Sequence, residues 1–167
     1  GFAGDNQNWA LRMTGQGGKA CLNFLFASTP VAGGGDRHWH RWTTTDGFVP
    51  RTGWHHVAVT YRFGEPESIQ GWLNGKQLPG RWDMGGPTKQ PPINDDDEIW
   101  IGSSMGGSAG VSWNGGLDAI AIHRRVLDEA TLKKRYRRVG EITLVGLAPP
   151  VMPELGPLPS DRVVVTF

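Results

Sequence analysis

Apolar and polar residues alternate in short runs along most of the chain. Because successive side chains of a β-strand point to opposite faces, such alternation predicts half-buried strands. The pattern predicts strands over residues 8–14, 20–27, 37–45, 54–62, 69–73, 77–82, 97–102 and 116–123. Asn74 and Gly75, between two of these strands, are the pair that a type I′ hairpin turn prefers. Residues 54–62 and 116–123 are apolar on both faces, which indicates strands buried on both sides.

One segment near the C-terminal end has helical periodicity instead. Residues 128–138 begin with acidic side chains and end with basic ones, an order that complements the helix dipole. Leu132 and Tyr136 form a short apolar stripe, and Gly140 favours an end to the helix. The basic side chains of residues 124–138 favour a solvated helix face, with a surface for sulfated or acidic glycans as the alternative.

The composition narrows the class of protein. The 167 residues include 25 glycines and 12 prolines, close to twice the average share of about 12%. This content argues against a coiled coil, a collagen and a long-helix protein. The net charge of +1 gives no reason to expect a nucleic-acid partner, and no run approaches the ~18 apolar residues of a membrane span. Cys21 is the single cysteine, so the chain has no internal disulfide.

Prolines also suggest where the domain ends. Five of them lie between residues 141 and 160, as is typical of an extended linker. We therefore expect one domain over residues 1–140 and a Pro-rich linker over residues 141–160. Residues 161–167 then either begin a following domain or return as a strand.

Five motifs follow one another in a characteristic order. They are residues 54–61 (WHHVAVTY), 71–76 (GWLNGK), 99–103 (IWIGS), 113–122 (WNGGLDAIAI) and 127–132 (LDEATL), the last leading to Tyr136. Together they resemble the laminin-G-like jelly-roll family of the concanavalin A-like lectin/glucanase superfamily. The resemblance implies an all-β fold, a jelly-roll antiparallel β-sandwich with one short C-terminal helix and a Pro-rich tail.

Two further features bear on this resemblance. Family members usually open with one or two strands before the counterpart of residues 8–14. Those strands are absent here, so either the chain is a fragment or residues 162–167 supply a replacement strand. Residues 36–62 are also similar to the version of the domain found in large planctomycete multidomain proteins that carry cytochrome-c-like domains.

Seven of the eight tryptophans fall into two groups, and we expect the eighth, Trp9, to pair inside the first hairpin. Trp54, Trp72 and Trp100 lie in strands that the family uses for its core, so we expect them to be buried. Sugar-binding modules stack pyranose rings on exposed aromatic side chains and hydrogen-bond the hydroxyls with polar neighbours. The candidate ligand-binding residues, all near predicted loops, are Trp39, Trp42, Trp82, Trp113 and Asn114. The alternative for each of these tryptophans is a packed core side chain.

Acidic residues suggest a calcium site. Calcium prefers several oxygen ligands from a flexible loop, and the resemblance implies one Ca²⁺ because many family members bind it. The candidate ligands are Asp95, Asp96 and Asp118. The alternatives are a solvated acidic turn for the first two and a backbone-capping side chain for Asp118. His38 and His40 share a strand face, and we expect hydrogen-bonded sheet residues there, because a zinc or copper site needs a third ligand.

The sequence offers no catalytic pair. A glycosidase needs two carboxylates flanking the scissile bond, and the superfamily's strand signature Glu-x-Asp-x-x-Glu does not occur. We therefore expect no catalytic residues and no enzyme activity. The resemblance implies a non-catalytic recognition module for carbohydrate or protein within a larger extracytoplasmic protein, either periplasmic, secreted or on the cell surface, without membrane insertion. The alternatives are a structural spacer that docks on neighbouring domains of its own chain and a degenerate glycoside hydrolase.

Overall fold

Two antiparallel sheets form the centre of the described part of the chain. The structure, a computed structural model, describes residues 8–29, 38–93, 99–103 and 112–140, with the backbone alone for 138–140. The strands are β1 (Trp9–Gln16), β2 (Lys19–Ser28), β3 (His38–Phe48), β4 (Val57–Thr60), β5 (Gln70–Leu73), β6 (Lys76–Leu78) and β7 (Gly80–Met84). One sheet has the order β1-β2-β3-β7, and the other has the order β4-β5-β6. The predicted mostly-β, antiparallel fold is confirmed.

Tight turns connect the first two strands and the middle pair. The β1–β2 hairpin turns at Gly17 and Gly18, with Gln16 paired to Lys19. The β5–β6 hairpin turns at Asn74 (φ 51°) and Gly75 (φ 73°). Two successive positive φ values define the type I′ turn that the sequence predicts, and its twist matches that of the flanking strands.

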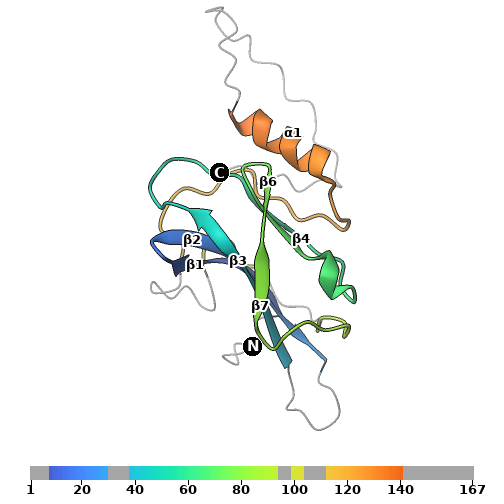
Figure 1. The fold of residues 1–167 in the computed structure, drawn as a ribbon. Coiled ribbons are helices and arrows are strands. Elements are labelled where there is room, and N and C mark those ends of the chain that lie inside the picture. The colour runs from blue at the N-terminus through green and yellow to red at the C-terminus, as the bar shows by residue number, and fades with distance from the viewer. Residues whose placement is uncertain (1–7, 30–37, 94–98, 104–111, 141–167) are drawn as a thin grey trace, which may run out of the picture.

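The chain changes sheets at Pro79. Strand β6 pairs with β5, whereas β7, which starts one residue after Pro79, pairs with β3 of the other sheet. Figure 1 shows the green β6 continuing into β7 across the two sheets. The Pro79 carbonyl accepts a hydrogen bond from the Thr45 backbone N–H at 2.9 Å. Proline suits this corner because it has no N–H to contribute to a ladder. The predicted return strand 77–82 is therefore two short strands in two sheets.

Aromatic side chains fill the space between the sheets. Trp42 on β3 is only 5% exposed, and a Cβ on Gly80 would lie 2.1 Å from its ring. Phe26 on β2 is fully buried, and its ring meets Tyr61 at 5.6 Å and Trp82 at 6.1 Å between centroids. These contacts bury large apolar surfaces, which is the main stabilising term for a small sandwich.

The helix packs against the three-stranded sheet near its β5–β6 turn. Helix α1 (Glu129–Gly140) lies beside the β5–β6 end of that sheet (Figure 1). Trp72 on β5 packs in a buried cluster with Leu127 and with Leu132 of α1. The Asp128 carboxylate accepts the Thr131 backbone N–H at 2.8 Å and so caps the helix N-terminus. The predicted helix is confirmed, and within the described residues no helix has the length and apolar character needed to cross a membrane.

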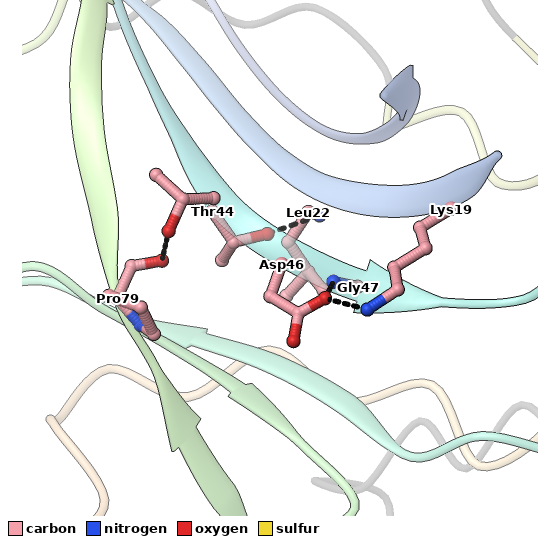
Figure 2. Close-up of polar contacts among 7 residues, drawn as sticks. Lys19, Leu22, Thr44, Asp46, Gly47 and Pro79 are labelled. Carbon is pink, nitrogen blue, oxygen red and sulfur yellow. Dashed lines mark hydrogen bonds and ion pairs between the residues drawn. The ribbon is translucent and has the colours of Figure 1, made fainter. Parts of the chain in front are cut away.

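The pairing of β2 with β3 is interrupted by a β-bulge near the start of β2. The register of the two strands shifts between Cys21 and Asn23. The Leu22 backbone N–H, displaced from the ladder, donates to the buried Thr44 hydroxyl oxygen at 2.9 Å. Figure 2 shows this contact beside Asp46, whose carboxylate accepts from the Gly47 backbone N–H and from Lys19. A side chain thus replaces the lost ladder bond, as is common at bulges.

Two predicted strands are wrong in the described residues. Residues 99–102 and 116–123 contain no strand, and Ile99 and Ile122 are each 62% exposed. Ala119 has a φ of 52°, and its backbone N–H bonds to the Asp118 carboxylate at 2.7 Å. This local side-chain bond turns the backbone out of the extended conformation that a strand requires.

Of the three tryptophans predicted to lie in the core, one is buried and two are exposed. Trp72 is 3% exposed, so its prediction is confirmed. Trp54 and Trp100 are 67% and 45% exposed, so their predictions are wrong. Trp54 precedes β4, which begins only at Val57 instead of at the predicted residue 54. Trp100 lies in a segment without strand pairing.

Candidate binding face

The outer face of the four-stranded sheet carries a set of polar side chains in register. Alternation along β3 places Trp42 inside, so Trp39, Arg41 and Thr43 point outward. Strand pairing places Asn23 of β2 opposite Thr43. The same pairing brings Arg12 of β1 opposite Asn23 and Arg81 of β7 opposite Thr43. Directly paired residues share a face of the sheet, so these side chains form one surface, here called the outer face.

Hydrogen bonds engage four of these side chains, together with Asp83 of β7, in a row across all four strands, here called the polar row. Arg12 Nε and Nη2 donate to Asn23 Oδ1 at 3.3 and 3.1 Å. Asn23 Nδ2 donates to Thr43 Oγ1 at 2.8 Å, and Thr43 in turn helps to lower the pKa of the Asp83 carboxyl. Arg41 Nε donates to Asp83 Oδ1 at 2.7 Å. The acceptor oxygens of Asn23, Thr43 and Asp83 therefore each have a donor within the row.

Burial holds the middle of the polar row in place. Asn23 and Thr43 are 3% and 1% exposed, so their polar atoms depend on one another for partners. Buried polar groups are stable only when they are hydrogen-bonded. Because both amide atoms of Asn23 are engaged, the rotamers of Asn23 and Thr43 are fixed. The row thus presents the flanking Arg12 and Asp83 in defined positions.

Arg41 and Asp83 form a half-buried ion pair at the β7 end of the row, with side chains 30% and 20% exposed. Partial burial alone would raise the pKa of the Asp83 carboxyl, but hydrogen bonds from Arg41 and Thr43 and the Arg41 charge outweigh it and lower that pKa. Asp83 is therefore an anion at neutral pH and accepts hydrogen bonds only.

Arg12 lies at the β1 end of the row in a different electrostatic setting. Partial burial and the positive charge of Arg41 both lower the pKa of the Arg12 guanidinium. A guanidinium stays protonated in proteins, so Arg12 remains a cation. Among the described residues, no ion pair includes Arg12. Its positive charge is held in place by a neutral amide.

The predicted sugar-stacking tryptophans of the sheet are placed on both of its faces. Trp39 lies half-buried on the outer face, paired with Ala27. Trp42 is buried in the core, so its ring is not accessible for stacking on a ligand. Trp82 is half-buried on the inner face, where its ring meets Phe26, His40 and Tyr61. The structure thus leaves Trp39 as the candidate beside the polar row.

Trp113 and Asn114 lie in the segment after residue 111, away from any described strand. Trp113 is 41% exposed, and its Nε1–H donates to the Gly116 carbonyl at 3.2 Å. Asn114 is exposed. The two residues are adjacent in sequence and form a separate, smaller candidate position. Five predicted ligand-binding residues are therefore spread over two sheet faces and one loop.

The calcium prediction rests on residues that the structure describes only in part. Asp95 and Asp96 lie outside the described residues. Asp118 Oδ1 accepts the Ala119 backbone N–H, which is the capping role given as its alternative. Across the described residues, no group of three or more His, Cys, Asp or Glu side chains could hold a metal ion. The calcium site therefore stays a prediction.

His40 ties the loop after β7 to the sheet. Its ring is 1% exposed. Nδ1 lies 2.8 Å from the Gly86 carbonyl oxygen and Nε2 lies 2.9 Å from Ser28 Oγ. A carbonyl only accepts, so Nδ1 carries the proton and Nε2 accepts from the Ser28 hydroxyl. Farther along the same loop, the Ile93 N–H donates to the Ala27 carbonyl at 2.9 Å. The prediction of a hydrogen-bonded sheet histidine is confirmed for His40.

The polar row was not among the predicted sites. Arg12, Asn23, Arg41 and Asp83 are far apart in sequence, and each alone is an ordinary outward-facing strand residue. The alternation along residues 37–45 does indicate that Arg41 shares a face with Trp39. The register between strands is what joins them, and a shift at the β2–β3 bulge is invisible in the sequence.

The fold and this face together define an antiparallel β-sandwich with a polar surface on one sheet. Residues 2–133 match the Laminin_G_3 family model, described as the concanavalin A-like lectin/glucanases superfamily. The chain belongs to this family. No curated protein and no solved structure matches the chain at a significant level.

Proposed function

We propose that this domain is a non-catalytic recognition module that binds carbohydrate on the outer face, within a larger extracytoplasmic protein. The observation that carries the proposal is the polar row, with its fixed donors and acceptors, on the same face as the half-buried Trp39. Sugars are recognised by this combination, since the ring stacks on an indole and the hydroxyls bond to planar polar side chains. Membership of a superfamily that includes lectins supports the same conclusion.

The state of Asp83 favours binding over catalysis. A glycosidase needs a second carboxyl group roughly 5–9.5 Å away and a general acid whose pKa is raised. The pKa of Asp83 is lowered by its hydrogen bonds and by Arg41. Among the side chains of the polar row, Asp83 is the one carboxylate. These observations argue for a ligand acceptor in place of a proton donor, and against a degenerate glycoside hydrolase.

A glycan array on the 167-residue chain, read with calcium and again with EDTA, tests this proposal. We expect binding to at least one glycan class, with Trp39→Ala lowering affinity about tenfold, as loss of a stacking ring of about 1.4 kcal/mol would do. Trp54→Ala is the matched control, because it removes an exposed indole that lies outside the four-stranded sheet. Absence of binding in both conditions would overturn the proposal, and loss with EDTA alone would assign a role to the calcium candidates.

A specific observation favours the spacer as the second candidate function. Ile99, Ile101, Ile120, Ile122 and Val126 expose apolar side chains within one stretch of the chain. Contiguous exposed apolar residues commonly mark a docking surface. Hydrogen exchange over residues 99–126 distinguishes the two functions, because docking on a neighbouring domain would protect these amides in the longer protein and not in the isolated domain.

A further inference from the structure

The outer face has more positive than negative charge. Arg12, Arg41 and Arg81 occupy outward positions on three strands, whereas Asp83 is the one carboxylate of the polar row. Arg41 already neutralises Asp83 at 2.7 Å. The ion pairs among the described residues leave Arg12 and Arg81 without a carboxylate. A ligand on this face therefore meets a surplus of positive charge.

We propose that the module prefers acidic oligosaccharides and that Arg12 binds a uronate carboxylate of the ligand. This inference rests on the proposed carbohydrate binding and adds the ligand class. The Arg12 guanidinium donates two hydrogen bonds, from Nε and Nη2, to the side-chain oxygen of the buried Asn23. The guanidinium has further N–H groups, and such donors form charge-assisted hydrogen bonds with a planar carboxylate.

The setting of Arg12 makes an anionic ligand more favourable than a neutral one. Partial burial, and after it the positive charge of Arg41, disfavours the charge on the Arg12 guanidinium and lowers its pKa. A bound carboxylate relieves the repulsion from Arg41, whereas a sugar hydroxyl does not. The anchoring chain from Arg12 through Asn23 to Thr43 is in place before binding, so little side-chain entropy is lost when the ligand arrives.

Calorimetric titration of the 167-residue chain with a short oligogalacturonide, and with the same oligosaccharide after methyl esterification, tests the proposal. We expect the acid to bind about ten- to a hundredfold more tightly than the ester, the range for a hydrogen bond between charged groups. Arg12→Gln removes the charge but keeps a donor for Asn23, so it should abolish this preference. Arg12→Lys should keep part of the preference.

Controls separate the alternative outcomes. Arg62→Gln removes a cation that pairs with Glu65 in the 62–65 turn, and it should change nothing. Equal binding of acid and ester would leave the carbohydrate proposal standing and overturn the acidic preference. Absence of binding to any glycan would overturn both. A preference for a sulfated neutral oligosaccharide, or acid binding unchanged in Arg12→Gln, would overturn the assignment to Arg12 and point to the basic residues Lys134, Arg135 and Arg137 of α1. Thermal melts of each variant confirm that it is folded.

Discussion

The side-chain amide of Asn23 lies 2.8 Å from the Thr43 hydroxyl oxygen, and both side chains are buried in the four-stranded sheet. This bond connects the two halves of the polar row. On one side Asn23 accepts hydrogen bonds from Arg12, and on the other Thr43 helps to lower the pKa of Asp83. The same pair therefore contributes to the stability of the sheet and positions the groups that we propose to contact ligand.

Asn23→Ala should lower the free energy of unfolding by about 1–3 kcal/mol, because it leaves the buried Thr43 and the anchored Arg12 without a partner. Urea denaturation measures the change. The exposed Arg62→Ala variant is the control and should stay within roughly 0.5 kcal/mol of the parent, since its ion pair with Glu65 lies in solvent. An equal effect of the two substitutions would mean that the polar row adds nothing to stability.

The bulge between β2 and β3 gives a second prediction with a matched control one residue away. Thr44→Val keeps the shape of the side chain but removes the acceptor of the buried Leu22 N–H (Figure 2). We expect a loss of about 1–3 kcal/mol in the free energy of unfolding. Thr45→Val should cost little, because its exposed hydroxyl bonds to the Pro79 carbonyl, which also accepts the Thr45 backbone N–H. Equal losses in urea denaturation would contradict the assignment.

Helix α1 is attached to the three-stranded sheet through few buried side chains. Leu132 is 2% exposed and packs in the cluster with Trp72 and Leu127. Leu132→Ala should therefore cost about 2–5 kcal/mol, the range for a buried leucine. Leu11→Ala is the comparison, because Leu11 is 42% exposed. Thermal denaturation followed by circular dichroism compares the two, and a Leu132 variant as stable as the parent would mean that α1 does not depend on this contact.

Local patterns predicted the parts of the fold whose determinants are local. Alternation gave β1 to β3, the Asn74–Gly75 pair gave the type I′ turn, and charge order gave α1. The pattern failed for residues 116–123, because the Asp118 side chain bonds to the next backbone N–H and turns the chain at Ala119. Alternation of apolar residues does not show that a side chain will bond to the backbone N–H in place of a neighbouring strand.

The candidate site was predictable only in its aromatic part. Trp39 was among the predicted residues because indoles near loops are recognisable in any sequence. Whether an indole faces solvent is decided by packing, as for Trp42, which is covered by Gly71 and Gly80. The polar row depends on the pairing of strands whose residues are up to 71 positions apart, between Arg12 and Asp83, and no local signal reports that register.

The pH dependence of stability gives the last prediction, and it concerns His40. Burial lowers the pKa of the His40 imidazole, an effect that the hydrogen bond to the Gly86 carbonyl opposes and the nearby His38 adds to. The unfolded chain then takes up a proton at a higher pH than the folded chain does. The free energy of unfolding should therefore have its full value above about pH 6.5 and fall as the pH drops below that value.

The variant His40→Gln should flatten this dependence, since it removes the buried titrating ring that holds Ser28 and Gly86. His56 and His123 also have lowered pKa values, through burial and the charge of Arg135, so part of the dependence should remain. Thermal melts between about pH 8 and pH 5 measure the slope. His38→Gln, which removes an exposed ring 4.5 Å from that of His40, is the control. A slope in His40→Gln equal to that of the parent would show that His40 does not carry the effect.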